Sequence, residues 1–276
     1  MMSLYSTEWL NLAYFFFFVF LAFVLPLNSM QRRRVLSIGA SAIILLVATV
    51  TLDEAVHSPE TTVFRNFLPA VLMVFAYWQS GQFYLRPNLW LQERLHNLDR
   101  EIAGFLDRFR FNIRFKMWID TYLEIAYLFC YPMVPLGVAV FYLMKLEPHA
   151  QEFWTIVLPP SYICYALVAF AQTHPPRVLE GSGSQKPGSI RKFNMGIIQH
   201  TSIQINTFPS AHAASSMAVA LALIQFVPVA GWIFLWVAIS IAIAAAAGRY
   251  HFTADVVLGT AIALIWFAIW SAGFGL

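Results

Sequence analysis

The chain has 276 residues, of which 59% are hydrophobic and 11% are charged, and its mean hydropathy is +0.65. Average soluble domains carry about a quarter charged residues, so these values exclude a single water-soluble domain and predict a polytopic membrane protein. The net charge of +3 is too small to indicate a nucleic-acid partner.

Apolar segments long enough to cross a bilayer recur along the whole chain. A helical span needs about 20 apolar residues. This length predicts an all-α integral membrane protein with about eight transmembrane helices: 10–27, 35–52, 64–84, 118–144, 153–172, 210–229, 231–248 and 253–273. No basic residue precedes the first span, so we expect it to stay in the mature protein rather than to be cleaved as a signal peptide.

Two polar segments separate these predicted spans. Residues 86–116 alternate charged and apolar residues at helical spacing, which predicts an amphipathic helix at the membrane interface. This helix would serve either as a solvated connector or as a binder of lipid headgroups. Residues 173–207 contain clusters of Gly, Ser and Pro, which predict a flexible loop rather than a helix.

Basic residues are distributed unevenly between the two sides of the predicted bundle. If the spans alternate in direction, fifteen of the seventeen Lys and Arg residues share one side, and only Arg65 and Lys145 lie elsewhere. The positive-inside rule favours a cytoplasmic position for that side. Basic residues that bind phosphate or lipid would produce the same bias.

Polar residues that could take part in catalysis lie at the starts of two late spans. Ser210 and His212 open the sixth predicted span, and Arg249, His251 and Asp255 open the eighth. About two membrane crossings separate the histidines, so the chain returns to the face that it left and the two imidazoles can share a pocket. His251 and Asp255 are four residues apart, a spacing at which the carboxylate can orient the ring as a nucleophile or base.

A third polar cluster follows the fifth predicted span and lies on the same side. His174-Pro175-Pro176-Arg177 adds a guanidinium to that of Arg249 and to the hydroxyl of Ser210. Guanidinium and hydroxyl groups are typical ligands of phosphate, so phosphorus is the expected electrophile.

The three clusters resemble, in the same order, the motifs of the type-2 phosphatidic acid phosphatase superfamily. Phe208-Pro209-Ser210-Ala211-His212 fits its Ser-x-His motif. Pro175-Pro176-Arg177 is similar to the first motif of the branch that contains inositol phosphorylceramide synthase, an inositolphosphotransferase. His251-Phe252-Thr253-Ala254-Asp255 is similar to the third motif of sphingomyelin synthases.

Two positions depart from the pattern of the lipid phosphatases. Phe170 stands where those enzymes carry a Lys before the first-motif Arg, and Ala245 stands where they carry an Arg before the third-motif His. Arg249 resembles the Arg found instead in synthase-like bacterial relatives. Three basic residues are candidate replacements for the missing Lys: Lys186, Arg191 and Lys192.

The resemblance implies a six-helix catalytic core over 64–276, preceded by two additional helices in 1–63. It also implies that His251 attacks phosphorus to form a phosphohistidine, that Asp255 orients His251, and that His212 protonates the leaving oxygen and then activates the acceptor. Three residues would hold the nonbridging oxygens: Arg177, Arg249 and Ser210. This scheme uses no metal or other cofactor.

The acceptor side of the site is less defined by the sequence. Asp120 and Glu124 lie four residues apart at the start of the fourth predicted span, so both would face the pocket mouth if that helix joins the core. We treat them, together with Lys186, as candidates for binding the acceptor or substrate.

Two enzymatic functions would use all of these residues. The first is a membrane phosphotransferase that moves a phospho-headgroup between a phospholipid or prenyl phosphate and an alcohol such as inositol, ceramide or diacylglycerol. The second is a lipid phosphate phosphatase that uses water. The first and third motifs favour transfer. A transporter would place charges near the membrane midplane, whereas these charges lie at helix ends, and a noncatalytic scaffold would not need both histidines.

Sidedness and the identities of the lipid and the acceptor stay open at this stage, as does the oligomeric state. Enzymes of the resembled families usually work on the external or lumenal face, which opposes the cytoplasmic position that the charge bias favours.

Overall fold

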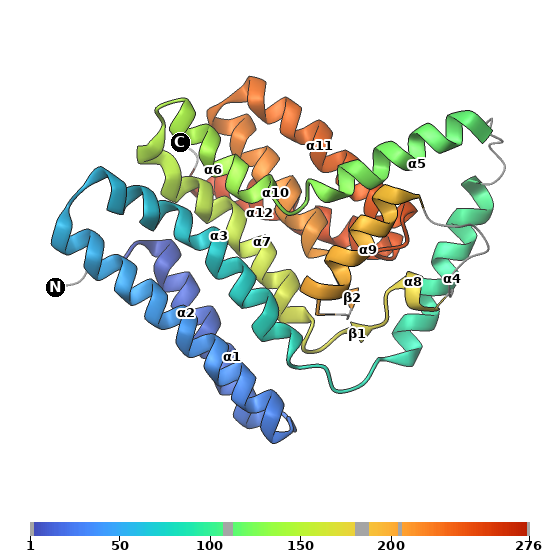
Figure 1. The fold of residues 1–276 in the computed structure, drawn as a ribbon, viewed down its shortest axis with the longest axis horizontal. Helices are drawn as coiled ribbons and strands as arrows, with labels where there is room; N and C mark the ends of the chain where they lie inside the picture. The colour runs from blue at the N-terminus through green and yellow to red at the C-terminus, as the bar shows by residue number, and fades with distance from the viewer. Residues whose placement is uncertain (1–2, 107–112, 180–187, 204–205, 275–276) are drawn as a thin grey trace.

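The computed structural model describes residues 3–106, 113–179, 188–203 and 206–274 and is almost entirely helical (Figure 1). This confirms the predicted all-α class. The helices are α1 (Ser6–Val24), α2 (Ser29–Val56), α3 (Pro59–Gly81), α4 (Leu89–Leu106), α5 (Ile113–Leu128), α6 (Met133–Leu143), α7 (Ala150–Leu167), α8 (Pro176–Leu179), α9 (Ser189–Thr201), α10 (Ala211–Phe226), α11 (Pro228–Ala247) and α12 (Thr253–Phe274). A 3-10 helix covers Glu147–His149, and the strands β1 (Gln172–Thr173) and β2 (Asn206–Thr207) form one antiparallel pair.

Among the described residues, four helices are long and apolar enough to cross a membrane, namely α1, α2, α11 and α12. A fifth span results if α5 and α6 are counted as one. The other predicted spans are present as α3, α7 and α10, of which α10 is apolar but only 16 residues long. The apolar helices support an integral membrane protein, and together with α3, α7 and α10 they are roughly consistent with the eight predicted spans.

The fourth predicted span, 118–144, is not a continuous helix. Met117–Leu128 and Met133–Leu143 are bent by 68° relative to each other. Pro132 explains the break, because proline lacks an N–H donor and disfavours the helical conformation of the residue before it. After the bend, α5 packs against α11 and α9.

The prediction of a flexible loop over 173–207 was wrong for the second half of this segment, which contains α9. The turn-forming residues end at Gly188, the residue before α9. Ile190, Ile197 and Ile198 then recur at helical spacing and give α9 an apolar face. The composition of the whole segment concealed this pattern. The predicted amphipathic segment 86–116 contains α4 and the start of α5.

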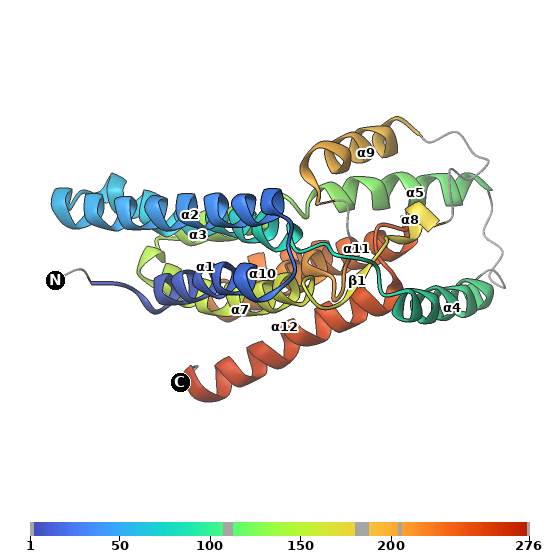
Figure 2. The same ribbon diagram turned by 90° about the horizontal axis from the view of Figure 1, so that it is seen from below.

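Helix α10 lies at the centre of the packing and is nearly surrounded by other helices (Figure 1). It packs against α6, α7, α11 and α12. Most of its buried side chains are Ala or Ser, and small residues let neighbouring backbones approach closely. Figure 2 shows α12 crossing below this core, with α4 beside the start of α12 and α9 above α5.

A buried ion network joins the two N-terminal helices to α3. The guanidinium of Arg65 on α3 lies 2.7 Å from Oε1 of Glu8 on α1 and 3.2 Å from Oδ2 of Asp53 on α2. The ring of Tyr5 covers the same guanidinium at 4.1 Å. Because Arg65 is only 5% exposed, each of these charges depends on the others for compensation.

We therefore expect Arg65→Ala to destabilise the protein strongly, because Glu8 and Asp53 would remain buried without a cation. Removing one partner of a buried pair costs about 3–5 kcal/mol, which corresponds to a fall of roughly 10 °C in the melting temperature. Thermal unfolding in detergent measures this fall, with the exposed Arg33→Ala as the control. Equal melting temperatures for the two variants would show that the buried ion network does not stabilise the protein.

Candidate active site

The structure brings the two predicted histidines together at one end of the bundle. His212 lies in the first turn of α10, and His251 lies just before α12. Their ring centroids are 5.8 Å apart, and the ring planes are inclined by 75°. Two side chains that are 39 residues apart in sequence are therefore close enough to act on the same small group.

Asp255, in the first turn of α12, lies beside His251. Its Oδ2 is 3.6 Å from Nδ1 of His251. The same oxygen accepts hydrogen bonds from the side-chain amide of Asn206 at 2.7 Å and from the backbone N–H of Phe252 at 3.0 Å. The carboxylate is completely buried, so its orientation is set by these donors rather than by water.

Asp255 also ties the start of α12 to the start of α10. Its backbone carbonyl accepts a hydrogen bond of 2.9 Å from the N–H of Ser210. Asn206, which reaches its carboxylate, belongs to β2 and pairs with Thr173 of β1. Asp255 thus contacts the second cluster directly through Ser210. Through Asn206 it is also linked to Thr173, the residue before the first cluster.

Arg177 lies on the short helix α8 and faces the same region. Its Nη1 donates to the carbonyl of Tyr250 at 3.2 Å, and its backbone N–H donates to the carbonyl of Arg249. Burial lowers the pKa of Arg177 below its ordinary value. A guanidinium stays protonated at neutral pH even so, and Arg177 therefore supplies a positive charge next to the histidines.

Arg249 and Ser210, the other two predicted phosphate ligands, each contact another group of the protein. Nη1 of Arg249 forms an ion pair of 3.0 Å with Oδ2 of Asp99 on α4. The hydroxyl of Ser210 is buried and caps α10 by accepting from the N–H of Ala213. Neither residue lines the cavity described below. Their phosphate-binding role stays a prediction.

Asp99 is a buried acidic residue that the sequence analysis missed. Besides pairing with Arg249, its Oδ1 accepts the N–H of Thr253 at 2.9 Å and so caps the start of α12. A signal was present: Asp99 lies four residues after the buried Leu95 and thus on the apolar face of α4. A carboxylate on that face requires a buried partner.

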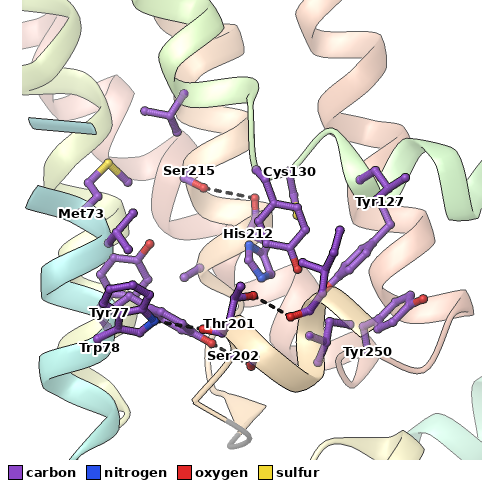
Figure 3. A pocket seen from close by; sticks show the side chains of 18 of the residues that line it. Met73, Tyr77, Trp78, Tyr127, Cys130, Thr201, Ser202, His212, Ser215 and Tyr250 are labelled. Carbon is purple, nitrogen blue, oxygen red and sulfur yellow. Dashed lines mark hydrogen bonds between the residues drawn. The ribbon is translucent and has the colours of Figure 1, made fainter. Parts of the chain in front are cut away.

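A cavity of about 580 Å³ opens next to the histidines (Figure 3). His212, His251 and Arg177 line its polar end, and mainly apolar and aromatic residues of α3, α5, α6 and α9 form the rest of its wall. In Figure 3, His212 lies between Met73, Tyr77 and Trp78 on one side and Tyr127 and Tyr250 on the other. A ligand with one polar end and one apolar end fits this division.

The cavity reaches the outer surface of the bundle beside α3 and α6. Val74, Trp78 and Tyr131 line it and are each about two-fifths exposed, with values of 43%, 40% and 39%. Its apolar part therefore reaches the surface of the bundle, whereas the carboxylate of Asp255 is completely buried.

Glu124 on α5 is the centre of a second polar network. Its carboxylate accepts hydrogen bonds from Tyr250 and Arg191 at 2.6 Å and from Asn194 at 2.7 Å. Tyr250 in turn stacks on Tyr127 at 3.9 Å. Glu124 thus fixes α9 and the ring of Tyr250 at the cavity wall, but it does not itself line the cavity.

The other two candidates for acceptor binding are not placed at the cavity. Asp120 is exposed on α5, one turn before Glu124, and does not line the cavity. Lys186 lies outside the described residues. Glu124, in contrast, hydrogen-bonds to Tyr250 of the cavity wall.

Gly259, one turn after Asp255, permits the close approach of α12 to the start of α10. A Cβ added there would lie 2.2 Å from the carbonyl oxygen of Ser210. Gly259→Ala must therefore push α12 away, and overpacking of this kind costs about 1–3 kcal/mol. We expect a lower melting temperature than for Gly273→Ala, a change in the same helix with open space around it. Indistinguishable melting curves would show that the contact tolerates a methyl group.

A comparison with protein families identifies the family of the chain. The model of the PAP2 superfamily matches residues 93–269, a segment that contains Arg177, His212, His251 and Asp255. No curated protein and no solved structure matches the chain. Members of this superfamily are phosphatases or phosphotransferases that act on lipids. Since the match covers more than half of the chain, this membrane enzyme belongs to the PAP2 superfamily.

Proposed function

We propose that this enzyme is a membrane phosphotransferase that moves a phospho-headgroup between a lipid and an alcohol acceptor. The observation that carries the proposal is the position of His212, His251 and Arg177 at the polar end of a cavity whose remaining wall is mainly apolar and aromatic. The apolar wall suits a lipid chain, and the polar end places its phosphate against a nucleophile, a proton donor and a cation.

In the proposed first step, Nε2 of His251 attacks phosphorus because Nδ1 faces the carboxylate of Asp255. A P–N bond forms while the bond from phosphorus to the leaving oxygen breaks, and His212 gives its proton to that oxygen. Asp255 stabilises the positive charge that develops on His251. In the second step the acceptor oxygen attacks phosphorus, its proton passes to His212, and the P–N bond breaks.

The charge of the cavity supports a phosphodiester donor over a phosphomonoester. Among the described residues that line the cavity, Arg177 is the one permanent cation. Arg191 and Arg249 form ion pairs with Glu124 and Asp99 and do not line it. One guanidinium balances the single charge of a diester better than the two charges of a monoester. A phosphatase that acts on monoesters remains the alternative, because it would use the same two histidines.

Product analysis distinguishes these two functions. The purified enzyme is incubated with phospholipids or prenyl phosphates, with and without inositol, ceramide or diacylglycerol, and phosphorus NMR follows the products. We expect a new lipid phosphodiester that depends on one of the alcohols. Free phosphate released from prenyl phosphate at the same rate with and without alcohol would favour the phosphatase.

The role of His212 is tested with leaving groups of different acidity. General acid catalysis contributes about 10²–10⁴-fold, but little of this is needed when the leaving oxygen is already stable. His212→Ala should therefore reduce turnover of an alkyl ester far more than turnover of a p-nitrophenyl ester. His149→Ala, at the other end of the bundle, is the control. An equal loss of turnover on both esters would show that His212 shapes the pocket and is not the general acid.

We also propose that the catalytic face is cytoplasmic. Gln31, beside the three arginines at the start of α2, donates to the carbonyl of Tyr84, and Gln172 accepts from the N–H of the next residue, Leu85. These contacts support placing the arginine cluster on the side of β1 and the histidines. The positive-inside rule then favours the cytoplasm for both.

A cysteine at the exposed Ser189 tests this sidedness in a Cys130→Ala, Cys164→Ala background. We expect an impermeant maleimide to label Ser189→Cys only after the cells are lysed. Labelling of intact cells would place the catalytic face outside and reverse the topology.

A further inference from the structure

Asn206 is a buried amide that belongs to none of the three motifs. It is 1% exposed and does not line the cavity, so it has no access to substrate. Its side-chain Nδ2 donates to Oγ1 of Thr173 at 3.0 Å and to Oδ2 of Asp255 at 2.7 Å. Both hydrogens of the amide are thereby used, one on the neighbouring strand and one on the carboxylate.

The position of this amide is fixed independently of Asp255. The pairing of β1 with β2 sets Thr173 opposite Asn206, and the hydroxyl of Thr173 then holds the rotation of the amide. The N–H of Phe252 donates to the same carboxylate oxygen at 3.0 Å. Two donors thus converge on the oxygen that lies 3.6 Å from Nδ1 of His251. They determine which oxygen of Asp255 faces the imidazole.

The chemistry of the amide suits this task. A neutral donor orients a carboxylate and leaves its negative charge intact, whereas a Lys or Arg at the same place would compete with His251 for that charge. On the basis of the function proposed above, we infer that Asn206 is a positioning residue: it holds Asp255 in the orientation that prepares His251 for attack on phosphorus.

Loss of a positioning residue should change kcat but not KM. Asn206→Ala should lower kcat by about 10–100-fold, the range found when an outer-shell partner of a catalytic group is removed. KM should stay nearly unchanged, because Asn206 does not reach the cavity. Asn206→Ser, a second variant that keeps a polar side chain but lacks the amide donor, should lower kcat in the same way. Asn66→Ala is the matched control, a buried amide at the far end of α3 that is bonded to Tyr142 and Gln151.

A double-mutant comparison with Asp255 distinguishes a positioning role of Asn206 from general destabilisation of the protein. In an Asp255→Asn background, Asn206→Ala should cause no further loss of kcat, because the carboxylate that it orients is already gone. An equal loss of kcat in both backgrounds, or a wild-type kcat in Asn206→Ala, would overturn the inference. His251→Ala distinguishes this failure from failure of the proposed function: normal turnover in that variant would remove the phosphohistidine mechanism itself.

Discussion

The arrangement of the site depends on one buried carboxylate. Placing the charge of Asp255 out of water at the start of α12 is costly unless donors surround it. The amide of Asn206 and the N–H of Phe252 supply these donors, and the N–H of Ser210 binds the carbonyl of the same residue. Satisfying one residue therefore requires β2, the start of α10 and the start of α12 to meet.

The rest of the bundle gives this polar end its apolar cavity. Helix α3, which precedes the segment matched by the PAP2 superfamily, contributes Tyr77 and Trp78 to the wall. Helix α9 closes another side and is held there by Glu124. Arg177, His212 and His251 thus lie at helix ends, while most of the remaining cavity wall is apolar or aromatic. This division allows a lipid to present its phosphate without leaving an apolar environment.

The sequence predicted the groups that local spacing and motif order define. His251 and Asp255 were expected on one face because they are four residues apart, and two crossings returned the chain from His212 to His251. Partners that depend on tertiary contacts were not predictable in this way. Asp99 precedes all three motifs, and Asn206 lies between the first and the second. Only the packed structure shows that Asp99 pairs with Arg249 and that Asn206 reaches Asp255. The break at Pro132 carried a local signal that the apolar length of the span obscured.

Trapping the covalent intermediate tests whether His251 is the nucleophile. A phosphorus-labelled donor is mixed with the enzyme without acceptor, the reaction is quenched in alkali, where phosphohistidine is stable, and the adduct is located by peptide mass spectrometry. We expect label on His251 that disappears when the acceptor is added and is strongly reduced in Asp255→Asn. Continued turnover with no label on His251, or label on another residue, would contradict it.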